Sequence, residues 1–479
     1  MAVKPSSMEN ENELVSPTGE IFHTPSFGIC IHVVSELDKP VDISHAKKAI
    51  QEILLPRGPR FSSIVTKNEK GELQWQTTEV NIDDHVFVPE FPSGHTVYDK
   101  FVEDYVSDMH TRKLPCSRPL WEFHFLNYKT TTAESTVIIN LHHMLGDGVS
   151  LMSLVIACST KVDNPTLPPS FTISSQQKKP PGHEIHESSY TAWLGLNFLN
   201  RIWRLLFTLL AVMYCTLYDL IASFLLLTWM EDSRFPIRGP PGVEMLPKVM
   251  ASANFLLQDV RKIKNFVGGS VNDVILGVVF CGFRRYCEMV LPDPNQIENL
   301  RVTAIALMNS RSQPGLKNLE EMTKPRTKTP WGNRWGFLQL AVPMEGFENP
   351  LEYILRAKRM QERKKMSLAV SITNKVISYI TRFRGPKVTA KALYNTLANT
   401  TFNITTMNGP SEKMKVAGYE VRSGYFSVSG IPQTILVTCL SYADNIRMQV
   451  ITTKGYVDAN KLSKCFEEAF LEMRDACLV

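Results

Sequence analysis

The sequence has no Cys-x-x-Cys pair, no long block of lysine and arginine, and no basic helix with interleaved aromatic residues. Its 9 cysteines are scattered, which argues against a disulfide framework and favours a reducing compartment. The missing basic stretch argues against nucleic-acid binding. The N-terminus is polar and acidic and lacks the basic start and apolar run of a secretory signal. The C-terminal DACLV is not a prenylation box.

The sequence also shows neither a covalent nucleophile nor a metal site. There is no Gly-x-Ser-x-Gly elbow and no cysteine in a recognisable catalytic context, so covalent catalysis through an acyl-enzyme is not expected. No cluster of three metal ligands is evident, so a metal site is not expected. No bound cofactor is expected either.

The chain that remains is folded and mildly basic. It has 479 residues, of which 44% are hydrophobic and 21% charged, enough for two or three sizeable cores. The net charge of +5 suits an anionic membrane surface or an anionic co-substrate such as coenzyme A.

Composition divides the chain into two α/β regions. Residues 1–20 contain few apolar residues and are expected to be disordered. Alternating strand-like and helix-like segments predict an N-terminal domain over 21–158 and a C-terminal domain over 245–479. Between them, residues 159–190 are rich in proline, serine and lysine and are expected to form a linker.

The most hydrophobic stretch follows this linker, over 191–232. Leu205 to Met230 is long enough to cross a bilayer, and tryptophans lie near both ends, as interfacial anchors do. The alternative is a core helix between the domains. Asp219 complicates a simple span, because a carboxylate in mid-bilayer is costly. A single crossing would also separate the two regions, so we expect a re-entrant or in-plane element with both regions cytosolic.

The segment STVIINLHHMLGDGVSLMSL, residues 135–154, carries the chemistry. A strand rich in β-branched residues ends in His142 and His143, and Asp147 and Gly148 follow before an apolar helix. Neighbouring residues of a strand point to opposite sides, so one histidine faces a cleft and the other the core. A neutral imidazole can accept a proton at neutral pH. Asp147 either orients the ring directly or holds the loop through a buried ion pair, and the glycines on both sides of it permit unusual backbone angles.

A base without a nucleophile predicts direct attack. The base takes a proton from an alcohol, whose oxygen attacks a carbonyl that is already activated. A thioester would supply that activation.

The motifs resemble those of a known family. HHMLGDG (142–148) matches the HHxxxDG motif of the coenzyme A-dependent acyltransferase superfamily. SRPLWEFH (117–124) resembles the PLWE segment of the wax ester synthase/diacylglycerol acyltransferase family. SVNDVILG (270–277) resembles its Asn-Asp motif, WGNRWGFLQLAVP (331–343) its Gly-Asn strand, and TTMNGP (405–410) in part a further turn. The apolar stretch is similar to that of the plant branch.

This resemblance implies a mixed α/β (α+β) fold. It would contain two chloramphenicol-acetyltransferase-like domains with a tunnel between them and a membrane-associated helical insertion. It implies that His143 is the general base and that His142, Asp147 and Gly148 support the loop. It also implies that Asn272 and Asp273 support the site from the second domain, although Asn272 equally suits a cap of the helix that follows it.

The predicted function is therefore a long-chain acyl-CoA:alcohol O-acyltransferase, a wax ester synthase, with diacylglycerol as an acceptor in a second activity. Acyl-CoA is the co-substrate, the membrane is a partner, and the residues that bind coenzyme A are not identified. The expected location is the endoplasmic reticulum membrane, or the plasma membrane, with a cytosolic active site. The alternatives are a non-catalytic membrane lipid-binding protein on the same scaffold, and a condensation-type enzyme acting on carrier-bound acyl groups.

Overall fold

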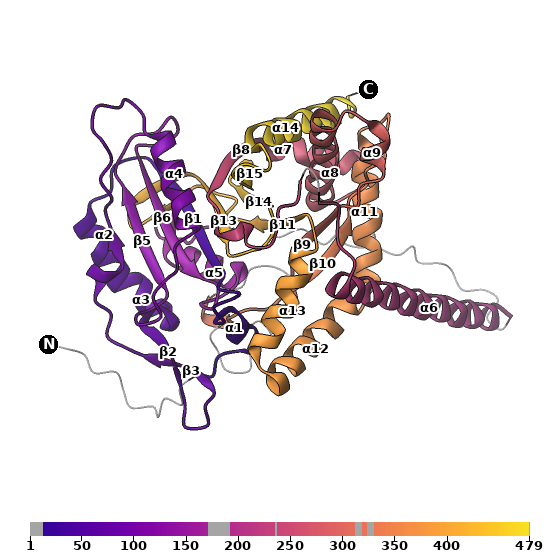
Figure 1. The fold of residues 1–479 in the computed structure, drawn as a ribbon, viewed down its shortest axis with the longest axis horizontal. Coiled ribbons are helices and arrows are strands. Elements are labelled where there is room, and N and C mark those ends of the chain that lie inside the picture. Colours follow the sequence, from indigo (N-terminus) through magenta and orange to yellow (C-terminus); the bar gives the residue numbers. More distant parts are fainter. Residues whose placement is uncertain (1–12, 171–191, 235–236, 312–318, 323–329, 479) are drawn as a thin grey trace.

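Two mixed β-sheets form the two lobes of the protein in a computed structural model that describes residues 13–170, 192–234, 237–311, 319–322 and 330–478 (Figure 1). The seven strands of the first sheet run in the order β4 (Val86–Phe87), β5 (Trp121–Leu126), β6 (Ser135–His142), β1 (Cys30–Leu37), β13 (Tyr419–Ser429), β12 (Met414–Val416) and β7 (Ser159–Lys161). The six strands of the second sheet run in the order β10 (Trp335–Ala341), β9 (Thr303–Asn309), β11 (Phe402–Asn408), β14 (Ile435–Tyr442), β15 (Asn445–Thr453) and β8 (Lys248–Leu256). A separate hairpin joins β2 (Ser63–Lys67) to β3 (Leu73–Thr77).

The helices are shared between the lobes. The first lobe carries α2 (Ile43–Ala49), which continues as a π-helical turn over Ile50–Leu54, then α3 (Leu55–Arg57), α4 (Asp99–Met109) and α5 (Gly148–Ala157). The second core contains residues of α7 (Leu257–Phe266), α8 (Val271–Val290), α9 (Pro294–Glu298), α11 (Leu351–Met366) and α14 (Ala459–Asp475). Three further helices are α10 (Leu319–Met322), α12 (Ala369–Arg384) and α13 (Pro386–Ala398).

The first sheet is completed by the C-terminal half of the chain. β13 pairs antiparallel with β1 from Cys30 opposite Ser429 to Leu37 opposite Val421, and β12 in turn pairs with β7. The predicted boundaries at 158 and 245 therefore do not separate two closed units. The linker predicted over 159–190 is wrong for 159–161, which form β7, and its residues 171–190 lie outside the described part of the chain. Pairing between strands about 400 residues apart leaves no local trace in the sequence.

The ordered part of the chain begins closer to the N-terminus than its composition predicted. Disorder is the wrong expectation for residues 13–20, whereas residues 1–12 lie outside the described part. α1 (Pro17–Phe22) has Pro17 at its first position and is capped by Ser16, whose hydroxyl accepts from the Gly19 amide. Ile21 and Phe22 are fully buried, and their burial helps to hold this short helix on the core.

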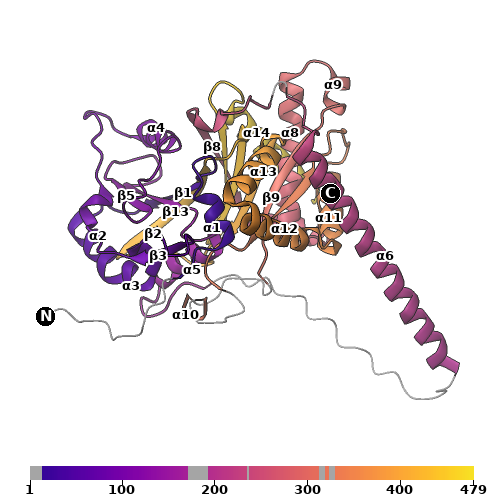
Figure 2. The same ribbon diagram turned by 60° about the horizontal axis from the view of Figure 1, so that its bottom comes forward.

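The apolar segment is one helix, α6 (Ala192–Thr228), that projects from the second lobe (Figure 2). Asn200–Thr228 is long and apolar enough to cross a membrane, and 11% of its most apolar window is buried. A core helix would be mostly buried, so that alternative does not hold. The helix has no break between 192 and 228, so the re-entrant form of the insertion is not what the structure describes.

The C-terminal half of α6 is docked by a buried ion pair. The Asp219 carboxylate is 2.7 Å from Nζ of Lys364 and 3.3 Å from the guanidinium of Arg363, both on α11. This pairing explains how a carboxylate is accommodated in an apolar helix, since the charge faces protein and has partners. Residues 201–210 at the other end are all exposed.

Candidate active site

His143 follows β6 and faces an apolar cavity because of the alternation along that strand. Val137, Ile139 and Leu141 line the cavity, and His143 continues the same face. His142 points the other way and does not line the cavity. Its Nδ1 accepts a hydrogen bond from the Met144 amide, and burial lowers its pKa to about 3, so it is neutral at physiological pH.

Asn333 holds His143 by two hydrogen bonds. The Asn333 Nδ2 group donates to the His143 carbonyl at 2.8 Å, and this fixes which side-chain atom faces the ring, because a carbonyl can only accept. The Asn333 Oδ1 atom therefore accepts from Nδ1–H of His143, at 2.9 Å. With the ring proton held on Nδ1, Nε2 keeps a free lone pair. Sequence reasoning missed Asn333, although it stands in the Gly-Asn segment that matches the family.

Burial lowers the pKa of His143, whereas the charge of Asp147 and the hydrogen bond to Asn333 act in the opposite direction. A lowered pKa keeps the ring unprotonated at neutral pH, which is the state that a general base needs. The ring also packs against Phe22 of α1, with 4.7 Å between ring centroids, and Phe22 stacks on Trp335. Phe22 and Asn333, both distant in sequence from His143, thus orient the imidazole.

Asp147 holds the loop by hydrogen bonds, and it acts on the ring only through its charge. It caps α5 by accepting from the Ser150 amide, and it accepts from the backbone amide of Arg334. Its two oxygens also take a bidentate pair from Arg311, at 2.7 and 3.1 Å, in a nearly fully buried contact. Of the two roles the sequence left open, the geometry is that of the buried ion pair.

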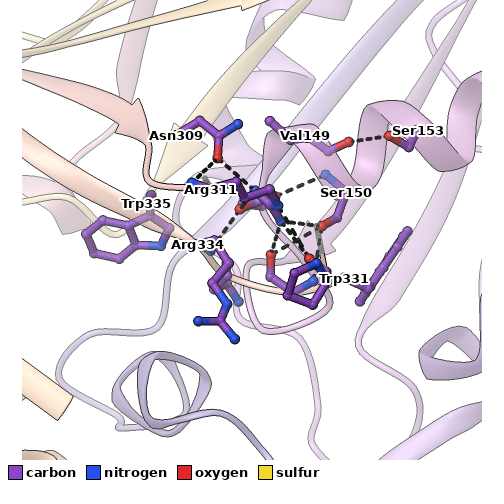
Figure 3. A network of polar contacts seen from close by, with 12 residues as sticks. Val149, Ser150, Ser153, Asn309, Arg311, Trp331, Arg334 and Trp335 are labelled. Carbon is purple, nitrogen blue, oxygen red and sulfur yellow. Dashed lines mark hydrogen bonds and ion pairs between the residues drawn. The ribbon is translucent and has the colours of Figure 1, made fainter. Parts of the chain in front are cut away.

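Arg311 lies at the centre of the polar contacts that join the two lobes at this loop (Figure 3). Besides Asp147, its guanidinium donates to Ser150 Oγ and to the Gly332 and Pro330 carbonyls. The Ser150 hydroxyl is also within hydrogen-bonding distance of both backbone groups of Gly332. Gly332 has φ +114°, a backbone angle that favours glycine, and this angle directs the next residue, Asn333, to His143.

The cavity has a volume of 380 Å³ and runs along one face of the first sheet. Ile29, whose carbonyl accepts from the His143 amide, lies just before β1 and lines the cavity. Alternate residues of β1 continue this lining as far as Leu37, and α2, α5 and β13 enclose the cavity. Eight residues of strand span about 26 Å, so the apolar lining extends far from the base. β9, β10, β11 and β14 contribute the wall from the second lobe. Gly148, at the start of α5, faces this wall, because an added Cβ would collide with the end of Met407 of β11.

The Asn-Asp pair of the second domain lies elsewhere. Neither Asn272 nor Asp273 lines the cavity. Asp273 is buried at the start of α8, where it forms a capping box with Ser270 and accepts from Nε2 of Gln361. Asn272 is exposed in the first turn of α8, and the residue that caps the helix is Ser270. The predicted capping role of Asn272 is therefore wrong. Within the described ranges no group of three metal-ligating side chains occurs.

Comparison with known proteins agrees with this architecture. Residues 38–275 match the wax ester synthase/diacylglycerol acyltransferase catalytic domain, and residues 331–474 match the WS/DGAT C-terminal domain. Wax ester synthase/diacylglycerol acyltransferase 5 of Arabidopsis thaliana is 31% identical, covering 98% of this chain and 94% of the relative. Wax ester synthase/diacylglycerol acyltransferase 11 of the same plant is 28% identical, covering 98% of this chain and 96% of the relative.

Two solved structures share the fold. The wax ester synthase/diacylglycerol acyltransferase from Marinobacter aquaeolei superposes with a TM-score of 0.59 at 15% identity, covering 98% of this chain and 100% of that one. A starter condensation domain of rhizomide synthetase, in complex with C8-CoA and Leu-SNAC, gives 0.54 at 10% identity, covering 98% and 95%. The similar sequences, which extend over nearly the whole length, decide the family. The chain belongs to the wax ester synthase/diacylglycerol acyltransferase family.

Proposed function

We propose that this O-acyltransferase joins a long-chain alcohol to a fatty acyl group carried on coenzyme A, giving a wax ester, and that it also accepts diacylglycerol. The observation that carries the proposal is the free Nε2 lone pair of His143 at the end of an apolar cavity. The long strand face from Ile29 to Leu37 suits an alkyl chain of one substrate.

The reaction follows from the position of the base. Nε2 of His143 takes the hydroxyl proton while the alcohol oxygen attacks the thioester carbonyl, and the carbon–oxygen bond forms. The tetrahedral intermediate then collapses and breaks the carbon–sulfur bond. The departing thiolate takes the proton back from the imidazolium, which regenerates the neutral base and releases free coenzyme A. Asn333 favours each step by keeping the other ring proton on Nδ1.

The membrane is the proposed source of the acceptor. α6 exposes Trp203, Phe207 and Leu210 by 60% or more, although an apolar helix of this kind is normally covered. The pairing of β7 with β12 requires the segments before and after α6 to lie on the same side of a membrane. An in-plane or partly inserted α6 satisfies both conditions, and we place the protein on the cytosolic face of the endoplasmic reticulum.

The test is an assay on membranes containing the protein, with labelled acyl-CoA and a panel of alcohols and diacylglycerol, followed by separation of the lipids. His143→Ala is expected to lose about 10²- to 10⁴-fold in turnover, the usual contribution of a general base, while staying folded. His142→Asn is the matched control, because an amide oxygen can accept from the Met144 amide as the ring does. Near-normal turnover in His143→Ala would exclude the mechanism, and binding of lipid without any ester formation would indicate a lipid-binding protein.

A further inference from the structure

α12 carries an exposed apolar stripe that the sequence analysis did not identify. Its members are spaced three or four residues apart, which puts them on one side of a helix. They are Leu368, Ile372, Val376, Tyr379 and Phe383, exposed by 36% to 64%. We call them the α12 stripe. The last two place their aromatic rings side by side, with 4.3 Å between centroids.

The opposite side of α12 is packed on protein. Asn374 donates to the Trp335 carbonyl at 3.1 Å, and Val370 lies so close to Gly336 that an added Cβ there would collide with it. The inner side of α12 therefore makes these packing contacts, whereas its outer side is apolar and exposed. Isolated exposed apolar residues are ordinary, but a continuous stripe of this size marks an interaction surface.

The charge around the stripe has one sign. Lys375 and Arg382 are exposed on α12, and Arg384, Lys387 and Lys391 are exposed at and beyond its C-terminal end. The sequence contains no aspartate or glutamate between Glu362 and Glu412. An apolar stripe with cationic neighbours is complementary to a bilayer that contains anionic lipids.

The stripe begins where α6 docks. The Leu368 amide donates to Thr216 Oγ1 of α6 at 3.0 Å, next to the ion pair of Asp219 with Lys364. α6 and α12 are therefore neighbouring helices that meet at this docking point, as Figures 1 and 2 both show.

We infer that α12 lies in the plane of the lipid–water interface beside α6, with the α12 stripe in the acyl boundary and its cations against anionic headgroups. The part of α6 before its docking point, residues 192–215, is about 36 Å long, so its length alone would suffice for a hydrocarbon core about 30 Å thick. The pairing of β7 with β12 keeps both ends of α6 on one side of the bilayer, so α6 lies in one leaflet without crossing, and α12 forms the second contact that sets the orientation of the protein.

This orientation brings the site close to the bilayer. The residues that α12 packs upon, Trp335 and Gly336, begin β10, and Trp335 lines the cavity and stacks on Phe22. α1 also contacts α12 and α13. Resting on the proposed function, an apolar alcohol would pass from the leaflet to His143 along this wall without crossing water.

Photolabelling tests the contact directly. The full chain is bound to vesicles of phosphatidylcholine with a minor share of phosphatidylserine and a diazirine-bearing phosphatidylcholine, irradiated, digested, and mapped by mass spectrometry. Label is expected on peptides of α6 and on residues 368–383, and not on Phe266 or Met289, which are equally exposed on α7 and α8. Label on α6 with none on α12 would overturn the inference.

Substitutions give a second measurement. Tyr379→Ser with Phe383→Ser is expected to weaken vesicle binding by at least about tenfold, because two aromatic side chains no longer enter the interface. Phe266→Ser with Met289→Ser removes similar exposed area elsewhere and should leave binding unchanged. Lys375→Gln with Arg382→Gln should reduce binding to phosphatidylserine-containing vesicles and not to pure phosphatidylcholine. Equal binding by all variants would contradict the assignment.

The outcomes separate this inference from the proposed function. In detergent with a short, water-soluble alcohol, the double serine variant should keep full activity, and it should lose activity on a long-chain alcohol in vesicles. An inactive wild type would end the proposed function while the labelling pattern still decides the membrane contact. A dimer that the serine variant dissociates, without lipid labelling of α12, would identify the stripe as a protein interface instead.

Discussion

The side-chain amide of Asn333 bonds both the ring and the backbone of His143, although 190 residues separate them in sequence. One contact sets the tautomer and the other sets the distance between the loop before β10 and the end of β6. Because the two residues come from different lobes, the base is in its working geometry only when the lobes are assembled. Asn333 is therefore a positioning residue for the reaction.

Asn333→Ala is expected to lower turnover by about 10²-fold with little change in KM for either substrate, because the ring loses its orientation. Asn333→Asp keeps the acceptor but adds a negative charge beside Nδ1, which raises the pKa of His143. The base is active when neutral, so the acid limb of the pH–rate profile should move to higher pH in Asn333→Asp. Asn374→Ala removes a comparable amide-to-carbonyl bond beside Trp335 and should move neither quantity. An unshifted profile in Asn333→Asp would rule out the positioning role.

Removing one member of the Asp147–Arg311 pair should destabilise the fold around the loop that holds His143. Arg311→Met leaves a buried carboxylate without its main partner, which typically costs 3–5 kcal/mol. Asp147→Asn with Arg311→Met should recover part of this loss, because no unpaired charge remains. Thermal unfolding of the two single variants and the double variant measures the coupling. The exposed pair of Lys100 and Asp104 is the control, since Lys100→Met should change stability by less than about 1 kcal/mol. Additive losses in the double variant would argue against a direct pair.

Buried neutral histidines should make the fold sensitive to mild acid. Burial lowers the pKa of His110 to about 4 and of His142 to about 3, and that of His32 well below its usual range. Between pH 6.5 and these values the unfolded chain binds more protons than the folded one, so stability is complete above pH 6.5 and falls as the pH drops. Each histidine contributes up to about 1.4 kcal/mol per pH unit.

Denaturant unfolding at several pH values between 7 and 5 checks this dependence. His110→Gln keeps a donor for the Val106 carbonyl but does not titrate, so its free energy of unfolding should fall less steeply with acid. A slope equal to that of the wild type would show that His110 does not contribute.

What the sequence could predict was local. The alternation of β6 and the HHxxxDG motif placed His143 on a cavity and His142 away from it, because both follow from neighbouring residues. The roles of Asn333 and Arg311 depend on loops that meet across the lobes, and no local pattern encodes that meeting. The only available signal was the Gly-Asn dipeptide, in which a glycine with positive φ precedes a buried amide. For the same reason, the sequence did not predict that β12 and β13, from the C-terminal half of the chain, belong to the first sheet.

The cavity along β1 should limit the length of one of the two alkyl chains. Its lining proceeds from Ile29, beside His143, through Ile31 and Val33 to Leu37, and every second residue advances about 6.6 Å. A tryptophan at one of these positions should block the cavity beyond it. Ile31→Trp should therefore restrict the enzyme to short chains, Val33→Trp to intermediate ones, and Leu37→Trp should remove only the longest.

Turnover measured with a series of acyl-CoA lengths at fixed alcohol, and then with a series of alcohols at fixed acyl-CoA, identifies which substrate the cavity holds. Only that series should show a cutoff that moves with the position of the tryptophan. Activity on the shortest chains serves as the folding control for each variant. A cutoff that does not follow the order of the three positions would mean that neither chain lies along this face of the sheet.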